Sequence, residues 1–214
     1  MQLAETRHGL PATTVLGRVL PGFVLDIDAT IVACHSEKES AAATWKHTFD
    51  FHPLLCFLDG AGEALAGLLR AGNAGSNTAA DHITVLDRAL DQIPEAHRYG
   101  NPILIRSDSA GSSHAFLAHI RSLREHGLHT QFSVGVAIGE AVRAAITAAT
   151  DWIPALNGDG SLRDGAELVE LTDLVDPVLL AGTRRTGSAQ ARAPDSAGSR
   201  RGCSPSTRRG SNWL

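Results

Sequence analysis

The sequence predicts a mixed α/β fold with the element order β-β-β-α-β-α-β. Short apolar runs bounded by glycine and proline indicate strands, whereas longer segments with apolar residues three or four positions apart indicate helices. The chain has 214 residues, of which 43% are hydrophobic and 20% are charged. This composition is typical of a globular protein and excludes a wholly disordered or fibrous chain.

The first strand is expected at residues 23–32, directly after the loop signal Pro21-Gly22. Side chains alternate along a strand, so the apolar residues with odd numbers occupy one face while Asp26 and Asp28 project together from the other. Two acids within an apolar strand require an explanation. A functional site provides one.

The remaining elements follow from periodicity and turn signals. Strands are expected at residues 52–58, 64–69, 102–107 and 131–136, and helices at residues 79–93, 113–126 and 139–149. The helix at 79–93 is the clearest, with a capping-box-like start at Thr78 and Asp81 and a stop at Pro94. The strand at 102–107 places Asp108 at its carboxyl end.

The chain changes character toward its C-terminus. Residues 183–214 hold 7 Arg and 1 Asp, a charge of +6, which leaves 12 Lys+Arg and 22 Asp+Glu, or −10, for residues 1–182. Residues 183–213 contain no Leu, Ile, Val, Phe or Met, so this segment is expected to be disordered. The predicted organisation is a short N-terminal segment (1–21), an α/β core (22–150), the start of an inserted β-rich subdomain (151–178) and a disordered Arg/Ser/Gly-rich tail (179–214).

One interpretation of the acidic strand is a haloacid-dehalogenase-like phosphatase, whose motif Asp-x-Asp-x-Thr matches Asp26, Asp28 and Thr30. In that chemistry Asp26 would attack phosphorus, Asp28 would be the general acid/base and Thr30 would bind phosphate. Residues 158–164 resemble the magnesium motif of that group. The cation that neutralises the phosphate has no counterpart beyond Arg143, an ad hoc substitute, and three successive strands do not fit a doubly wound sheet.

A second interpretation pairs Asp28 with Asp108. In an RNase H-like mixed sheet with this element order, the first and fourth strands are neighbours, so the two aspartates can share a metal site. Carboxylates suit Mg²⁺, a hard cation that takes oxygen ligands and keeps several waters. Two such ions roughly 3.5 to 4 Å apart would activate water or a DNA 3′-hydroxyl and stabilise the leaving oxygen. This interpretation predicts DNA strand chemistry.

Five segments in order resemble the catalytic core of bacterial DDE-type insertion-sequence transposases, over about residues 23 to 176. They are L-D-I-D-A-T (25–30), H-S-E-K-E (35–39), F-H-P-L-L (51–55), G-N-A-G-S-N-T-A-A-D-H (72–82) and I-R-S-D-S-A-G (105–111). The resemblance implies that Asp28 and Asp108 are catalytic metal ligands and that Asp26 could help to hold a metal. It also implies a two-metal Mg²⁺ or Mn²⁺ site, DNA at insertion-sequence ends as partner, and a homodimer or an association with a full-length transposase.

The resemblance further implies a third acid, a glutamate on a helix beyond the inserted subdomain, for which the sequence offers no candidate. The last acids before the tail belong to the insertion region; they are Glu167, Glu170, Asp173 and Asp176. We therefore expect a truncated copy with an out-of-frame tail that does not transpose DNA by itself. The alternative is a non-catalytic fragment that interferes with a full-length transposase.

Other motifs carry weaker indications. The three cysteines form no C-x-x-C pair, and the nearby Cys34, Cys56, His35, His47 and His52 lack the spacing of a zinc site. The loop at residues 72–78 could hold phosphate but lacks G-K-[ST] and serves equally as a turn and cap. Because this loop is one of the segments that resemble the transposase core, the resemblance implies a structural turn near DNA, which is the preferred interpretation. No secretory signal or membrane span is visible, and we expect a cytoplasmic, nucleoid-associated protein.

Overall fold

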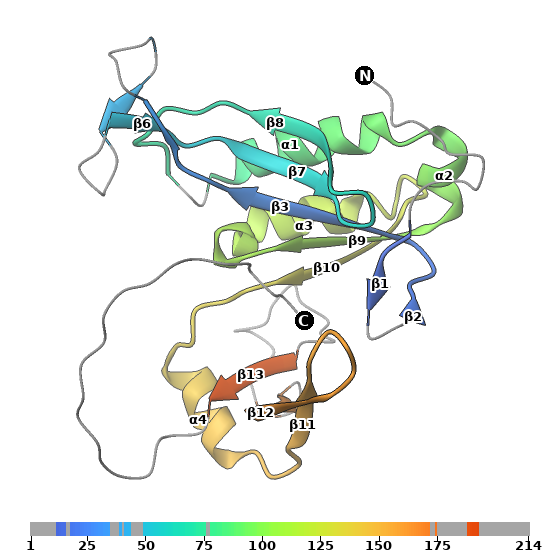
Figure 1. The fold of residues 1–214 in the computed structure, drawn as a ribbon, viewed down its shortest axis with the longest axis vertical. Coiled ribbons are helices and arrows are strands. Elements are labelled where there is room, and N and C mark those ends of the chain that lie inside the picture. Colours follow the sequence, from blue (N-terminus) through green and yellow to red (C-terminus); the bar gives the residue numbers. More distant parts are fainter. Residues whose placement is uncertain are drawn as a thin grey trace.

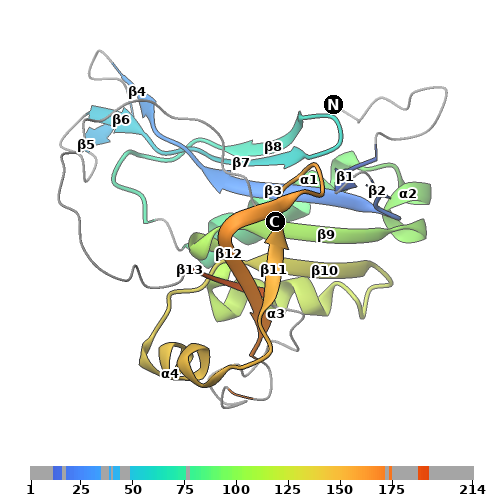
Figure 2. The same ribbon diagram turned by 60° about the horizontal axis from the view of Figure 1, so that its bottom comes forward.

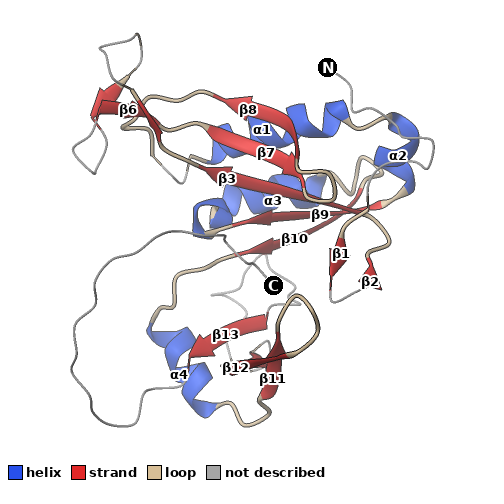
Figure 3. Cartoon of the chain, in the orientation of Figure 1, coloured by secondary structure: helices blue, strands red, loops and turns tan. Residues whose placement is uncertain are grey.

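A computed structural model describes residues 12–15, 18–34, 39, 41–43, 49–75, 78–171, 174 and 188–192. Its strands are β1 (Thr14–Val15), β2 (Arg18–Val19), β3 (Phe23–Ala29), β4 (Val32–Ala33), β5 (Ala42–Ala43), β6 (Phe49–Phe51), β7 (Leu54–Leu58), β8 (Glu63–Leu68), β9 (Pro102–Ser107), β10 (His129–Val134), β11 (Ile153–Leu156), β12 (Leu162–Glu170) and β13 (Ser188–Arg192). Its helices are α1 (Ala79–Gln92), α2 (Glu95–Gly100), the 3-10 helix η1 (Ser109–Ser112), α3 (His114–Ser122) and α4 (Glu140–Ala148). The fold is therefore mixed α/β, as the sequence predicts (Figure 3).

A five-stranded mixed sheet with the order β10-β9-β3-β7-β8 forms the centre of the fold (Figure 1). The first three strands along the chain, β3, β7 and β8, pair antiparallel, whereas β9 and β10 run parallel to β3. The sheet neighbours β3 and β9 are the first and fourth strands expected from the sequence. Their pairing confirms the predicted adjacency of these two strands.

Helices α1 and α3 cover one face of this sheet (Figure 1, Figure 2). The residues with odd numbers on β3 and β9 point toward the helices, and Leu25, Ile27 and Ile105 are fully buried there with Phe116 of α3. A continuous apolar core of this kind supplies the main stabilisation of a domain. The residues with even numbers face the other side, which leaves Asp26 half-buried and Asp28 exposed.

Two helix ends and one additional helix differ from the expectations. Thr78 precedes α1 without capping it, because its hydroxyl donates to the Gly75 carbonyl at 3.0 Å. Helix α3 ends at Ser122 rather than near residue 126 because residues 123–127 form turns and Gly127 adopts φ +86°, a conformation that favours glycine. Residues 95–100, directly after Pro94, form the unexpected short helix α2.

The strands also include elements that periodicity did not indicate. A small sheet of order β4-β6-β5 follows β3, and β1 pairs with β2 within the short N-terminal segment, for which no strand was predicted. Strand β10 begins at His129, two residues before the expected start, and pairs along its whole length with β9. Each of the short strands has two or three residues, which is too few for an alternation pattern to be recognised.

The C-terminal part holds α4 and the sheet β11-β12-β13, reached by the segment that leaves the carboxyl end of β10 (Figure 1). Ala145 of α4 packs with Val169 and Leu171 in a second, small core. Residues 188–192 form β13, paired with β12, so these five residues differ from the expected disorder of the tail. The rest of 179–214 lies outside the described residues. None of the helices in the described part is long and apolar enough to cross a membrane.

Candidate functional site

The two aspartates singled out by the sequence lie at the same edge of the central sheet. Asp28 is near the carboxyl end of β3 and Asp108 directly follows β9, and these two strands run parallel. The last paired residues are Ile27 and Ser107, so each aspartate is one position beyond this pair. Strand alternation then places both carboxylates on the face opposite the helices.

Asp108 is held by the turn that follows β9. It precedes the 3-10 helix η1, and its side chain accepts a hydrogen bond from the Ala110 amide at 2.8 Å. Gly111 permits this turn to pack tightly, because a Cβ at that position would lie 2.6 Å from the Cβ of Ser107. Gly135 similarly passes close to the backbone of Asp108 and Ser109. Small residues therefore fix the backbone that carries the Asp108 carboxylate.

Asp28 is electrostatically coupled to the acids around it. Although its side chain reaches solvent, partial burial among the strand ends raises the pKa of Asp28, and the charges of Asp108 and Asp26 raise it further. The hydrogen bond from the Ala29 amide, at 2.8 Å, and the charge of His52 lower this pKa. The coupling places Asp108 and His52 within electrostatic reach of Asp28. An excess of negative charge at this edge favours a bound cation.

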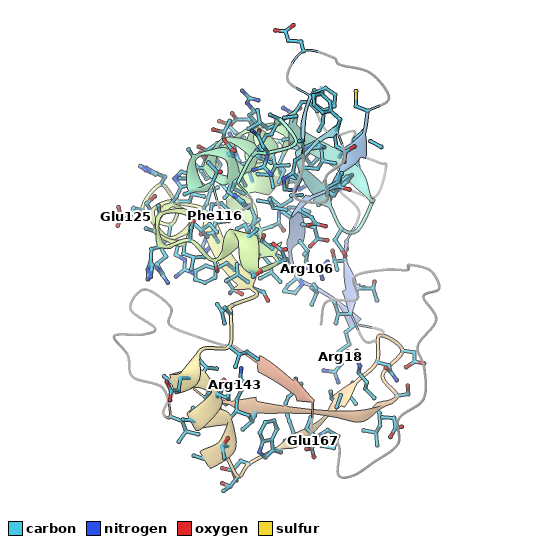
Figure 4. All side chains as sticks on the ribbon, turned by 90° about the vertical axis from the view of Figure 1, so that its left-hand side faces the viewer. Arg18, Arg106, Phe116, Glu125, Arg143 and Glu167 are labelled. Carbon is cyan, nitrogen blue, oxygen red and sulfur yellow. The ribbon has the colours of Figure 1, made fainter. Side chains whose placement is uncertain are left out.

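Asp26 is engaged differently, through a cluster that the sequence did not predict. Arg106 on β9 donates from Nε and Nη2 to the two carboxylate oxygens of Asp26, both at 2.6 Å. Nη2 also donates to Asp59, after β7, at 2.6 Å. The hydrogen bonds and charges of these two carboxylates raise the pKa of Arg106 further. Figure 4 shows Arg106 in relation to the core residue Phe116.

A second network at the same edge joins the segment before β7 to the loop after β8. The backbones of His52 and Arg70 are linked by a hydrogen bond from the His52 amide at 3.0 Å, and Arg70 Nε donates back to the His52 carbonyl at 2.9 Å. Arg70 Nη1 donates to the Gly75 carbonyl and pairs with Asp81 of α1. The Arg70 side chain is only 4% exposed, so it is a structural cation.

The donor atoms at the edge fit a divalent cation that prefers oxygen. Asp28 and Asp108 each use Oδ1 for a backbone amide, and neither Oδ2 has a hydrogen-bond partner among the residues that the structure describes. Mg²⁺ is commonly bound by one or two carboxylates together with waters and substrate phosphates. Within the described ranges, no three side chains of His, Cys, Asp or Glu are grouped closely enough to hold a metal by themselves. Waters and a phosphate would therefore complete the coordination.

The structure gives little support to the phosphatase interpretation or to a zinc site. Both oxygens of Asp26 are occupied by Arg106, which disfavours Asp26 as a phosphatase nucleophile, and the antiparallel neighbour β7 does not fit a doubly wound sheet. Asp159 belongs to a hairpin turn, where the Ser161 hydroxyl and amide lower its pKa. Cys56 is buried, while His35 and His47 lie outside the described residues.

The acids of the insertion region lie away from the central sheet. Glu167 and Glu170 are on β12, in the separate three-stranded sheet (Figure 4). Asp173 and Asp176 lie outside the described residues.

The glycine at the start of the glycine-rich loop is closely packed, because a Cβ on Gly72 would collide with the carbonyl oxygens of Ala42 and Asp50. This packing agrees with a structural role for Gly72.

The comparison with protein families specifies the class to which this mixed α/β core belongs. The model of the family "Transposase DDE domain group 1" matches residues 18–156. The chain therefore belongs to this transposase family. No curated protein matches the chain.

Among solved structures, the chain is similar to the piggyBac transposase in a cryo-EM synaptic complex with hairpin DNA. The TM-score is 0.42 and the sequence identity is 10%. The similarity covers 72% of this chain and 31% of the piggyBac chain. The chain thus spans about a third of the length of that protein.

Proposed function

We propose that this protein carries the two-aspartate metal site of a bacterial insertion-sequence transposase, an enzyme that cleaves and transfers DNA strands. We further propose that it does not transpose DNA by itself, because its sequence offers no third acid for the site. The observation that carries the proposal is the placement of Asp28 and Asp108 at the carboxyl ends of two adjacent parallel strands in a member of a transposase family. In the proposed organisation, residues 22–150 are an RNase H-like catalytic core and residues 151–178 begin an inserted β-rich subdomain. The strand order of the central sheet supports this interpretation.

Asp28 and Asp108 have the roles of metal ligands in this proposal. Mg²⁺ or Mn²⁺ held there would supply Lewis acidity to a phosphodiester and lower the pKa of a water or 3′-hydroxyl. The protein residues orient the two carboxylates through β3, β9 and the Ala110 amide. Arg106 keeps Asp26 neutralised beside them. Positioning and charge stabilisation of this kind account for most of the catalysis in phosphoryl transfer.

DNA is the proposed partner, at the ends of the insertion sequence, and a homodimer or an association with a full-length transposase is the proposed assembly. Residues 1–182 carry a charge of −10, with 12 Lys+Arg against 22 Asp+Glu. Such an acidic surface repels phosphates unless cations intervene. We therefore expect that DNA binding by the core depends on the divalent cation.

The experiment adds Mn²⁺ to the purified full chain and a DNA duplex that carries the terminal repeat of the element. We expect Mn²⁺ to raise the affinity for this DNA without producing nicks that end in a 3′-hydroxyl, and we expect Asp108→Asn to abolish this gain in affinity. A matched control is Asp164→Asn, at an exposed position of β12 far from the edge. DNA binding that does not respond to Mn²⁺, or that responds equally in Asp108→Asn, would contradict the proposed metal site. Nicks that end in a 3′-hydroxyl and depend on Asp108 would contradict the proposed inactivity.

A further inference from the structure

His52 lies at the edge of the central sheet that carries Asp28 and Asp108, and the proposed function assigns it no role. It precedes β7, which runs antiparallel to β3, so the start of β7 lies beside the carboxyl end of β3. The pairing of Leu54 with Ala29, and the hydrogen bond from the Thr30 amide to the Pro53 carbonyl at 3.1 Å, fix this position. This position agrees with the small effect of the His52 charge, which lowers the pKa of Asp28.

The imidazole ring of His52 is oriented by the loop after β8. Its Nδ1 lies 3.3 Å from the Ala74 carbonyl oxygen, which can only accept a hydrogen bond. Nδ1 must therefore carry the proton of the neutral ring, which leaves a lone pair on Nε2. The hydrogen bond of the His52 ring within the described part of the chain is the one from Nδ1, and the side chain is half-buried. Nε2 of His52 is thus a hydrogen-bond acceptor that the described residues do not occupy.

The loop that holds the ring is itself anchored from inside the protein. Arg70 donates to the His52 carbonyl and to the Gly75 carbonyl, and its pair with Asp81 ties this arrangement to the first turn of α1. Because Arg70 is almost fully buried, the anchor is rigid relative to the sheet. A histidine whose Nδ1 is bound to a backbone carbonyl, and whose other nitrogen is free, has the arrangement found around metal sites.

We propose that His52 is a positioning residue of the metal site, whose Nε2 accepts a hydrogen bond from a water molecule bound to the divalent cation at Asp28 and Asp108. Such an outer contact fits the geometry, since the described side chains do not form a cluster of three direct ligands. Mg²⁺ and Mn²⁺ keep several waters when few carboxylates bind them, so an acceptor beside the site orients one of these waters. This inference rests on the proposed function, because it requires a cation at the two aspartates.

Two substitutions separate the structural role of the ring from its role toward the cation. In His52→Asn, the side-chain amide can still donate to the Ala74 carbonyl, but it has no group at the position of Nε2. In His52→Gln, the longer side chain offers its amide oxygen as an acceptor near the position of Nε2 and gives up the contact with Ala74. His126→Asn, at an exposed turn near the opposite end of β10, is the matched control.

The experiment measures Mn²⁺ binding to each full-length variant by electron paramagnetic resonance, with thermal unfolding as a test of folding. We expect His52→Asn to bind Mn²⁺ about tenfold more weakly than the unaltered protein at an unchanged melting temperature. His52→Gln should recover part of this affinity, and His126→Asn should bind normally. Equal Mn²⁺ affinity in His52→Asn and the unaltered protein, or no recovery in His52→Gln, would overturn the role of His52 alone. If the unaltered protein binds no Mn²⁺ through Asp28 and Asp108, the proposed function fails as well.

Discussion

Arg106 on β9 holds both carboxylate oxygens of Asp26 on β3 at 2.6 Å, and thereby joins the two strands that carry the candidate metal ligands. The pair lies directly opposite in the sheet register and is shared with Asp59. Asp26 and Asp28 therefore differ in function although they project from the same face. The Asp26 carboxylate is paired with Arg106, whereas the Asp28 carboxylate remains available at the edge of the sheet.

Loss of the Arg106 cation should destabilise the protein. Arg106→Gln leaves Asp26 and Asp59 without their shared partner at partly buried positions, so we expect the free energy of unfolding to fall by about 1–3 kcal/mol. Urea unfolding of the full chain measures this change. The exposed Arg88→Gln on α1 is the control and should change stability by less than about 0.5 kcal/mol. Equal effects of the two substitutions would show that the cluster contributes nothing.

The raised pKa of Asp28 predicts the direction in which Asp28→Asn changes the free energy of unfolding. Since the folded protein raises this pKa above 3.8, ionised Asp28 is less favourable in the folded than in the unfolded chain. The carboxyl group therefore reduces stability as the pH rises through its folded pKa, and has no such effect below 3.8. Asp28→Asn should raise the free energy of unfolding at neutral pH, and the gain should vanish just below pH 3.8. Destabilisation by Asp28→Asn at neutral pH would refute this account.

The close approach of Gly111 to Ser107 should make the Asp108 turn sensitive to a single methyl group. Gly111→Ala introduces a Cβ that would lie 2.6 Å from the Cβ of Ser107, so the turn or the end of β9 must shift. We expect a loss of about 1–3 kcal/mol in stability, measured by chemical unfolding, together with weaker Mn²⁺ binding. Gly100→Ala, whose added methyl meets nothing within 4 Å, should change neither quantity appreciably.

The buried thiol of Cys56 should resist modification in the native protein. Burial, with a smaller contribution from the charge of Asp26, raises the pKa of Cys56 to about 12, so almost no thiolate is present near neutral pH. We expect iodoacetamide to label Cys56 only after unfolding, as measured by peptide mass spectrometry. Labelling of native Cys56 at the rate found in denaturant would contradict the burial of β7 against α1.

Short apolar runs bounded by turn signals predicted most of the central strands, because these strands carry side chains into the core. The expected strands at 52–58, 64–69 and 102–107 correspond to β7, β8 and β9, and the acidic strand corresponds to β3 with its aspartates on the predicted face. The adjacency of β3 and β9 followed from the element order. Helix ends were less predictable, since Leu123 continues the apolar face of α3 while residues 123–127 form turns and Gly127 adopts a positive φ.

The surroundings of the site depended on contacts that a linear pattern does not contain. Arg106 and Asp26 meet because of the exact register between two strands, and Asp59 joins them only through the turn after β7. His52 and Arg70 each lie within or beside segments that resemble the transposase core, yet their hydrogen bonds link different loops. The sequence analysis assigned no role to Arg70, and only the fold indicates the partner of each side chain.

The most direct test of the central claim is a Mn²⁺ titration of the unaltered full chain, Asp28→Asn, Asp108→Asn and Asp26→Asn, followed by electron paramagnetic resonance. The account predicts that Asp28→Asn and Asp108→Asn each weaken Mn²⁺ binding strongly. It predicts a smaller effect for Asp26→Asn, because both oxygens of Asp26 are already bound to Arg106. Mn²⁺ binding that survives both Asp28→Asn and Asp108→Asn, or that depends mainly on Asp26, would contradict the account.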